Sequence, residues 1–537
     1  MTRARPRVLA ALAAVVAAAV AVVVVLVSAS GQTAQPRLVE SLFQDDNHLV
    51  YAPTPVVAST LDTLASLGVD RLRITVLWSA IAPGAASSAR PAGFRASDPA
   101  SYPPFAWAPY DRIVQLAAAR HIGVDFNVTA PGPLWAMAGR APASKLANHF
   151  APSAAEFGGF VAALGRRYSG AYVPPGAHAP LPRVNYWSIW NEPNQPGWLA
   201  PQWAVFGGQP RMAAPVLYRA LLDSAWRALT LTGHTTASDT ILIGELAPEG
   251  AEASAPSSPI PPLPFLRTLY CVGADDHPLS GQAAVAAACP SGGRGFVAAH
   301  PALFDPTGFA HHPYSFFLAP TSSMPDPNFA PLSDLSRLES TLDAIFSVYG
   351  VGRRLPIYLT EYGYETDPPN PYRGVSPGRQ SLYLNEAQYL AWRDPRVRAM
   401  SQFLLFDSQP DRRFRPGSLR YWSTFQTGLL YANGRRKPSF NSYRLPIVVP
   451  QPRFAPGASV FIWAMLRLAP NGTRQDAEIQ WRPSGGSYRT LATVTTDDPS
   501  GFLTARLRIP GTGAIRVLWI SPTGRTFHSR AVGVVEE

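Results

Sequence analysis

The sequence predicts an α/β fold in which a (β/α)8 TIM barrel is followed by a small C-terminal all-β sandwich. Strand-like and helix-like segments alternate over residues 38–445, and short alternating strands separated by turns replace them after residue 456. A chain of 537 residues can form one large domain and one smaller domain. We therefore expect a barrel at 38–445, a Pro-rich linker at 446–456 and a sandwich at 457–537.

Residues 1–37 have the pattern of an export segment. Arg3, Arg5 and Arg7 precede an unbroken apolar run at 8–27, and small residues follow it. A basic start with an apolar run is typical of a signal peptide, and a run of this length at about 1.5 Å per residue also spans a bilayer. The sequence leaves cleavage and anchoring open, but either predicts a secreted or membrane-anchored protein outside the cytoplasm.

The barrel segments follow in order along the chain. Strands are predicted at 38–49, 71–78, 123–129, from Tyr186, and then at 240–246, 308–314, 356–361 and 399–406. Helices are predicted at 54–67, 110–120, 153–168, 215–229, 332–349 and 377–393. Gly68 gives the first helix a C-terminal cap signal, and Ser153 with Glu156 has capping-box spacing. This alternation is the pattern of a (β/α)8 barrel with insertions.

The segments after the linker are short and alternate between apolar and polar residues. They are predicted as strands at 459–468, 477–481, 488–495, 501–509, 514–520 and 527–535, with Pro, Gly, Asn and Asp turns between them. Such a series is typical of a small all-β sandwich.

Two barrel strands end in a carboxylate. The stretch YWSIWNEPN ends in Asn191, Glu192 and Pro193, and Pro193 cannot continue a ladder; the stretch PIYLTEYGY carries Glu361. Catalysis in this fold takes place at the C-terminal ends of the strands. Glycoside hydrolysis needs a carboxylic acid for the leaving oxygen and a second carboxylate to attack the sugar or activate water. We expect the two glutamates to share one site, with Asn191 bonded to a sugar 2-hydroxyl; the alternative is that both are ordinary exposed residues.

These motifs resemble the retaining glycoside hydrolases of clan A, with family 39 and family 5 nearest. The resemblance covers the barrel and rests on WNEPN after strand four and TEYG after strand seven. It implies Glu192 as acid/base and Glu361 as nucleophile. In those families an Arg in strand two supports the nucleophile, which Arg73 matches, and a His-x-Tyr ends strand six, which His312 and Tyr314 match. The Tyr would contact the nucleophile and help hold it ionised.

The sequence leaves two roles open for the aromatic residues around the expected site. Clan members often carry a Trp at the end of strand eight, but FLLFD has none, so Phe406 or Trp422 is the candidate substitute. Trp78, Trp135 and Trp198 follow strands two, three and four, and they either line a cleft or belong to the core.

Further polar residues are predicted to have structural roles. Glu245 and Glu249 end strand five and are interpreted as structural or substrate-loop residues, because two carboxylates already suffice for the mechanism. His311 is predicted to be structural. Cys271 and Cys289 are expected to form a disulfide in an exported protein, the alternative being two unrelated thiols.

Composition and motif searches exclude several other classes of protein. The net charge is +11, yet no dense Lys/Arg run of the kind found in nucleic-acid-binding proteins occurs. The positive charge is compatible with binding to anionic surfaces or acidic polysaccharides. No His-Glu-x-x-His, zinc-spaced Cys pair, Gly-x-Gly-x-x-Gly or phosphate loop is present, so no metal, cofactor or nucleic-acid partner is expected.

The predicted function is therefore a retaining glycosidase that cleaves O-glycosidic bonds of a poly- or oligosaccharide through a two-glutamate double displacement. The alternative is a non-catalytic carbohydrate-binding cell-surface protein on the same barrel. An acid/nucleophile pair argues against that alternative, since binding alone needs neither. The sugar, the linkage and the oligomeric state stay open.

Overall fold

The computed structural model describes residues 38–138, 144–251, 254–290, 293 and 295–537. The N-terminal segment 1–37, with the predicted anchor at 8–27, lies outside the described residues. Within the described part of the chain, no helix combines the length and apolar character needed to cross a membrane.

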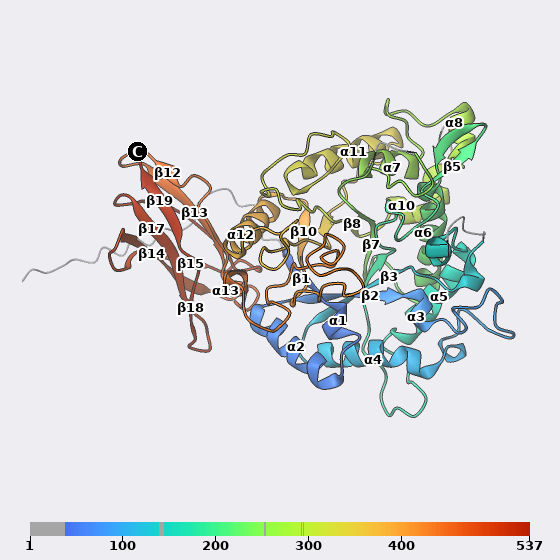
Figure 1. Cartoon of the computed structure of the whole chain (residues 1–537), viewed down its shortest axis with the longest axis horizontal. Coiled ribbons are helices and arrows are strands. Elements are labelled where there is room, and N and C mark those ends of the chain that lie inside the picture. Colours follow the sequence, from blue (N-terminus) through green and yellow to red (C-terminus); the bar gives the residue numbers. More distant parts are fainter. Residues whose placement is uncertain (1–37, 139–143, 252–253, 291–292, 294) are drawn as a thin grey trace, which may run out of the picture.

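Eight parallel strands close into a barrel in the order β1-β10-β9-β8-β7-β4-β3-β2, which confirms the predicted (β/α)8 fold (Figure 1). The strands are β1 Glu40–Gln44, β2 Arg71–Leu77, β3 Gly123–Thr129, β4 Tyr186–Ile189, β7 Thr240–Leu246, β8 Gly308–His311, β9 Ile357–Leu359 and β10 Val397–Phe403. Most of their residues are buried, as expected for parallel strands covered by helices.

Most helices that surround the barrel lie within about three residues of their predicted limits, whereas α4 (Pro104–Ala118) begins six residues before its predicted start at 110. The surrounding helices are α2 Thr54–Leu67, α4 Pro104–Ala118, α5 Ala154–Arg167, α6 Ala214–Leu231, α11 Leu335–Val348 and α12 Pro377–Arg393. Gly68 caps α2 with φ 78°, and a Cβ there would lie 2.6 Å from the Arg467 carbonyl oxygen, so only glycine fits. Ser153 Oγ accepts from the Glu156 N–H at the start of α5 (3.4 Å).

Shorter elements connect these parts. The helices are α1 Asp46–Leu49, α3 Trp78–Ile81, α7 Pro262–Leu269, α8 Gly281–Ala286, α9 Phe296–Ala299, α10 Pro301–Phe304 and α13 Pro438–Arg444. The 3-10 turns are η1 Pro99–Ser101, η2 Leu134–Ala136, η3 Ser144–His149 and η5 Leu332–Asp334, and β5 Trp203–Phe206 pairs with β6 Gln209–Met212.

Several predicted strands end earlier than expected, and one side chain contributes to two of these differences. The segment predicted as one strand at 38–49 divides into β1 and α1, because Asp45 caps α1 by accepting from the His48 N–H (3.3 Å). Strand β10 ends at Phe403 instead of 406. Leu404 has φ 72°, and the next N–H, of Leu405, donates to Asp45 Oδ2 (3.1 Å) instead of a ladder.

The C-terminal residues form the two sheets of the predicted sandwich. One has the order β11-β13-β16; the other has the order β12-β19-β17-β14-β15, with β18 on β17. The strands are β11 Ile447–Val448, β12 Arg453–Phe454, β13 Ser459–Met465, β14 Gln475–Pro483, β15 Arg489–Thr496, β16 Phe502–Arg508, β17 Gly513–Ile520, β18 Thr526–His528 and β19 Val532–Glu536. The stretch 446–456 thus contributes two short strands, and Ile447 and Phe454 are buried in the sandwich core. The single strand predicted at 527–535 is divided at Ser529, whose Oγ accepts from the Val517 N–H (2.8 Å).

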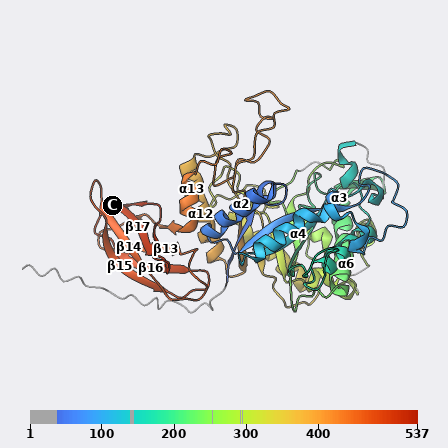
Figure 2. The same cartoon turned by 90° about the horizontal axis from the view of Figure 1, so that it is seen from below.

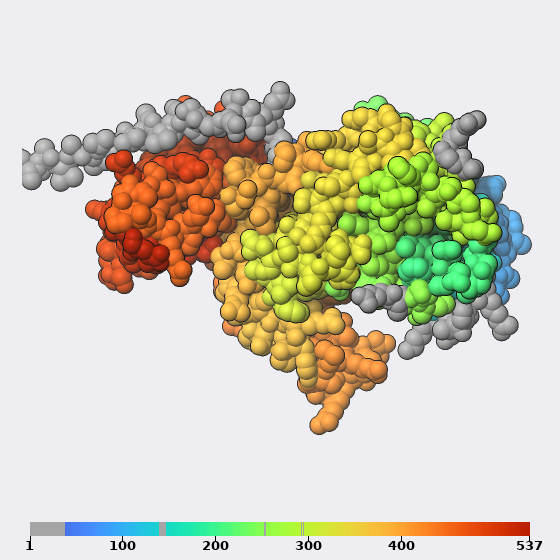
Figure 3. Space-filling view, turned by 90° about the horizontal axis from the view of Figure 1, so that it is seen from above, coloured from blue at the N-terminus to red at the C-terminus, as the bar shows by residue number. Residues whose placement is uncertain are grey.

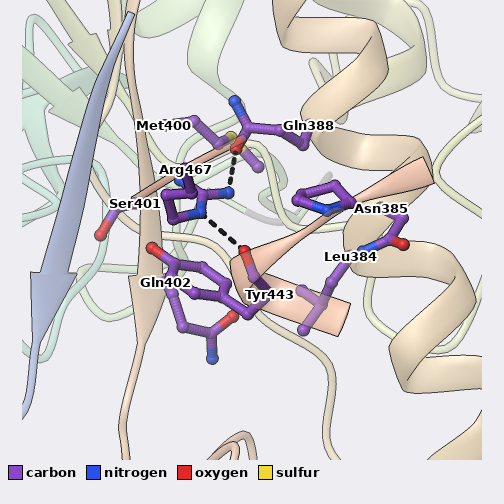
Figure 4. A pocket seen from close by; sticks show the side chains of 9 residues that line it. Leu384, Asn385, Gln388, Met400, Ser401, Gln402, Tyr443 and Arg467 are labelled. Atoms are coloured by element: carbon purple, nitrogen blue, oxygen red, sulfur yellow. Dashed lines mark hydrogen bonds between the residues drawn. The ribbon is translucent and has the colours of Figure 1, made fainter. Parts of the chain in front are cut away.

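The sandwich packs against the barrel through α12 and α13 (Figure 1). Figure 4 shows Arg467 at this junction, where its Nε donates to the Tyr443 carbonyl oxygen (2.7 Å) and its Nη2 to Gln388 Oε1 (3.2 Å). Arg467 also contacts Ser41 of β1, and burial lowers the pKa of its guanidinium. A buried cation that follows β13 of the sandwich and bonds to three barrel residues indicates a fixed junction.

The disulfide between Cys271 and Cys289 is present, as predicted, in the long connection between β7 and β8. In the chain-entropy model, a disulfide that closes a loop of this size stabilises the fold by about 3 kcal/mol. We expect a Cys271→Ser/Cys289→Ser variant to lose about that much free energy of unfolding in denaturant titrations. Reducing the native protein should reproduce the loss, and unchanged stability in both experiments would contradict the prediction.

Candidate active site

A cavity of about 710 Å³ opens at the C-terminal ends of the barrel strands. Glu192 follows β4 and Glu361 follows β9, and both line it, as do Tyr314 after β8 and Asn191. Strand β4 stops abruptly: Trp190 has φ 70° and Glu192 φ 37°, values that are strained for residues with a side chain. The structure therefore brings the two predicted glutamates into one site.

Glu361 is almost fully buried and receives one donor on each carboxylate oxygen. Arg73 Nη1 donates to Oε1 (2.6 Å), and Tyr314 Oη donates to Oε2 (3.1 Å). Burial, together with the negative charge of Glu361, raises the pKa of Tyr314 well above its usual value, so the hydroxyl keeps its proton and remains a donor. These bonds fix the orientation of the Glu361 carboxylate.

Arg73 is fully buried beneath the cavity and connects several side chains. Besides Glu361, it donates to Gln44 Oε1 (2.5 Å), Asn191 Oδ1 (2.7 Å) and Glu245 Oε2 (2.7 Å). Burial opposes the guanidinium charge, but the carboxylates of Glu245 and Glu361 outweigh this effect and raise the pKa of Arg73. Arg73 is thus a fixed cation.

His312 joins Glu192 to the same network. Its Nδ1 lies 3.0 Å from Glu192 Oε1, and its Nε2 lies 2.8 Å from Glu245 Oε2. Burial alone would lower the pKa of His312, but the charge of Glu361 and the bonds to Glu192 and Glu245 raise it to about 9. Glu192, His312 and Glu361 each offer one atom that could bind a metal ion, and these atoms lie within 4.8 Å of one another. A protonated imidazole with both nitrogens engaged is a hydrogen-bond donor and not a metal ligand.

Glu245 is central to the site, although the sequence analysis assigned it only a structural or loop role. It is fully buried, and besides Arg73 and His312 it accepts from Thr360 Oγ1 (3.0 Å). Burial alone would raise the pKa of Glu245, but Arg73 and His312 hold it at about 2. An irregularity in β7 between Gly244 and Leu246 gives Glu245 φ 52°. The Gly before Glu in TILIGEL was a bulge signal that could have identified this residue.

The Glu245 network predicts a pH dependence of stability. Because folding raises the pKa of His312, the protonated imidazole stabilises the fold. This contribution is complete below pH 6.5, the ordinary pKa of histidine, and is lost as the pH rises through about 9. Because folding lowers the pKa of Glu245, its ionised carboxylate also stabilises the fold. This contribution is complete above pH 4.5, the ordinary pKa of glutamate, and is lost as the pH falls towards about 2.

We expect Glu245→Gln to lower the free energy of unfolding by roughly 3 kcal/mol at neutral pH, because it breaks a buried ion pair. The deficit should shrink between pH 4.5 and 2, because the carboxylate of the unfolded chain takes up protons in this range while the native carboxylate stays ionised down to about pH 2. The fall in stability between pH 6.5 and 9 should become smaller, because the pKa of His312 drops. Denaturant titrations across pH measure both effects, and a deficit independent of pH would contradict this account.

Two of the predicted tryptophans lie outside the cavity. Trp78 begins α3, is 1% exposed and packs against Phe160 with ring centroids 6.0 Å apart. Trp135 donates its Nε1–H to the Pro83 carbonyl oxygen (2.9 Å). Both belong to the packing beside α5, because β2 ends at Leu77 and the chain turns away from the cavity there. Of the two roles that the sequence left open, the core role fits Trp78 and Trp135, whereas Trp198 lines the cavity.

The residues proposed to replace the strand-eight Trp are also placed elsewhere. Phe406 stacks on His48 with centroids 4.2 Å apart, and neither it nor Trp422 is among the described residues that line the cavity. Phe403 and Phe425 line it instead. The end of β1 and the start of α1 add polar lining residues that the sequence analysis missed, namely Gln44 from β1 and Asp46 and Asn47 from α1. His311 is buried, with Nε2 2.7 Å from the Ala330 carbonyl oxygen, as a structural role requires.

No family model matches the chain, and no curated protein matches it. Among solved structures, a GH5_18 protein from Streptomyces cattleya in complex with GlcNAc has 16% identity and a TM-score of 0.40, covering 76% of this chain and 79% of that one. A family 1 β-glucosidase from Thermotoga maritima has 14% identity and a TM-score of 0.41, covering 71% and 83%. Bacteroides uniformis β-glucuronidase 2 has 10% identity and a TM-score of 0.40. The match covers 94% of this chain but only 46% of that protein, so this chain spans less than half of its length. Structural similarities this distant carry no functional argument. The function is therefore inferred from the geometry of the cavity alone.

Proposed function

We propose that the protein is a retaining glycoside hydrolase with Glu361 as nucleophile and Glu192 as acid/base. The observation that carries the proposal is that carboxylate oxygens of Glu192 and Glu361 lie within 4.8 Å of each other at the cavity. Carboxyl groups stand about 5 to 5.5 Å apart in retaining enzymes and about 6.5 to 9.5 Å apart in inverting ones. The short separation matches that of retaining enzymes, so it favours direct attack by the carboxylate on the sugar.

In the first step, a Glu361 oxygen bonds to the anomeric carbon while the bond to the leaving oxygen breaks, and that oxygen takes the proton of Glu192. Arg73 and Tyr314 hold the attacking carboxylate in place. In the second step, Glu192 takes a proton from water, the water oxygen bonds to the anomeric carbon, and the bond to Glu361 breaks. His312 can donate to the ionised Glu192 that exists between the two steps.

Asn191 is oriented to bind the substrate with its amide N–H group. Its Oδ1 accepts from Arg73 (2.7 Å), which has no acceptor to offer in return, so the Nδ2 group is the part that remains for the cavity. A bond from Nδ2 to a sugar 2-hydroxyl would strengthen as the transition state forms.

The activity is tested by incubating the protein with a panel of aryl glycosides and following the released sugar by NMR at early times. We expect at least one glycoside to be cleaved and the first product to keep the anomeric configuration of its substrate. An inverted first product would contradict the double displacement. Sugar binding without any turnover would favour the non-catalytic alternative.

We also propose that the enzyme acts outside the cytoplasm. The Cys271–Cys289 disulfide supports this, because such bonds persist in oxidising compartments, and the apolar run at 8–27 is a suitable export segment. Expression with residues 1–37 fused to a reporter should place the reporter outside the cytoplasm, and cytoplasmic retention would contradict the proposal.

A further inference from the structure

A segment that we call the basic arm, residues 408–425, follows β10 and projects from the barrel (Figure 2; orange in Figure 3). Its two legs run antiparallel: the Ser408 N–H donates to the Phe425 carbonyl oxygen (2.8 Å), and the Asp411 N–H donates to that of Tyr421 (2.9 Å). Tyr372 of the neighbouring loop donates its hydroxyl to the Gly417 carbonyl oxygen (2.6 Å). The arm is therefore held in a defined position.

The arm carries a concentrated positive charge. Arg412, Arg413, Arg415 and Arg420 are all exposed, and Asp411, the one acidic residue in the arm, pairs with Arg413 (2.6 Å). No carboxylate of the described residues forms an ion pair with any of the other three guanidinium groups. Three arginines within nine residues thus keep their charge available for an external anion.

The arm begins and ends at the wall of the cavity, since Ser408 and Phe425 both line it. The cavity itself is predominantly acidic, because its described lining residues include five carboxylates, of Asp46, Glu192, Glu249, Glu361 and Glu365, against one arginine, Arg373. A chain leaving the cavity along the arm would therefore pass from acidic surroundings into basic ones.

Exposed aromatic rings stand at the same opening. Phe425 is 53% exposed at the base of the arm, and Phe317, which also lines the cavity, is 61% exposed. Flat apolar faces of this kind stack against sugar rings.

We propose that the basic arm binds the anionic groups of an acidic polysaccharide while a neutral sugar of the same chain occupies the cavity. This rests on the proposed glycosidase function. An acidic sugar beside Glu361 and Glu249 would meet like charges, whereas the same group a few sugars away would face Arg412, Arg415 and Arg420. A polysaccharide fits better than a lipid surface or a nucleic acid, because the arm is continuous with a cavity that holds a glycosidase-type carboxylate pair.

The test measures binding to hyaluronan, unsulfated chondroitin and gellan, each of which contains neutral sugars as well as uronates, at low ionic strength, with Glu361→Gln as the background to prevent hydrolysis. We expect at least one of these polymers to bind, to be released by added salt, and to bind less when its carboxyl groups are methyl-esterified. The triple change Arg412→Gln/Arg415→Gln/Arg420→Gln should weaken binding about tenfold, since each exposed charge contact contributes a few-fold.

A matched control removes three exposed arginines from the sandwich, Arg474, Arg508 and Arg525, and so changes the net charge equally. The match includes ring contacts, because Arg420 lies over Phe414 (5.6 Å) as Arg525 lies over Phe527 (5.5 Å). We expect the control to change binding less than about twofold. Equal losses in the two triple variants, or no binding to any of the three polymers, would overturn the proposal.

Two further arms of the experiment separate other outcomes. Tighter arm-dependent binding to phosphatidylglycerol-containing vesicles or to duplex DNA than to any of the polymers would overturn the proposal in favour of a lipid surface or a nucleic acid. Arm-dependent polymer binding without cleavage of any aryl glycoside would refute the proposed hydrolase function but not the binding role of the arm.

Discussion

Glu361→Gln is expected to reduce turnover of every glycoside by at least about 10⁴-fold, because an amide cannot replace the attacking carboxylate. The substituted side chain has almost the same shape, and its Oε1 can still accept from Arg73, so the fold should be preserved. Activated aryl glycosides should not rescue the variant, since a better leaving group does not supply a nucleophile. Steady-state kcat with phenyl and dinitrophenyl glycosides measures the loss.

Glu40→Gln is a matched control for this variant. Glu40 pairs with Arg71 (2.9 Å) at the opposite end of the barrel strands, so the control also removes a carboxylate from an arginine pair. It should leave kcat unchanged within about twofold, as expected for a change remote from the reacting atoms. If Glu361→Gln kept substantial activity on any substrate, or if both variants lost activity equally, the nucleophile assignment would be wrong.

Glu192→Gln should have a large effect that depends on the leaving group. For phenyl glycosides, whose leaving oxygen needs a proton, we expect kcat/KM to fall by about 10² to 10⁴. For dinitrophenyl glycosides the first step needs no acid, so it should be spared while the second step, now without its base, becomes limiting. The covalent species should accumulate, which stopped-flow measurements would detect as a burst of dinitrophenol.

Azide provides a second readout for the same variant, because it attacks the glycosyl-enzyme without losing a proton. Added azide should therefore accelerate Glu192→Gln and yield a glycosyl azide of retained configuration, but it should not accelerate Glu361→Gln. A uniform loss across leaving groups with no response to azide would exclude Glu192 as the acid/base. Full activity on a natural glycan would exclude it equally.

The sequence predicted those parts of the fold that depend on local patterns. The limits of α2 and α12 follow from residues beside them in the chain, such as Gly68 and the Pro377 that opens α12, and they were predicted without error. Glu192 and Glu361 were predicted as strand-end carboxylates for the same reason. The end of β10 was missed, because it depends on a bond from the Leu405 N–H to Asp45, 360 residues away.

The environment of the catalytic groups could not be read from local patterns either. Glu245 has a central position because a bulge in β7 turns it towards Arg73 and His312, which arrive from other strands. The sequence left Trp78 as either a cleft or a core residue, and a turn directly after β2 buries its ring against α5. Both outcomes depend on where the chain turns at a strand end, which strand propensity does not determine.

Covalent trapping tests the central claim most directly. The native protein would be incubated with activated 2-deoxy-2-fluoro glycosides, in which the fluorine slows both steps and the good leaving group restores the first. The labelled protein would then be digested and its peptides sequenced by mass spectrometry. The account predicts that one fluoro-sugar is attached through an ester to Glu361 and that Glu361→Gln remains unlabelled. A label on any other residue, or release of the fluoro-sugar with inversion and no covalent species, would contradict it.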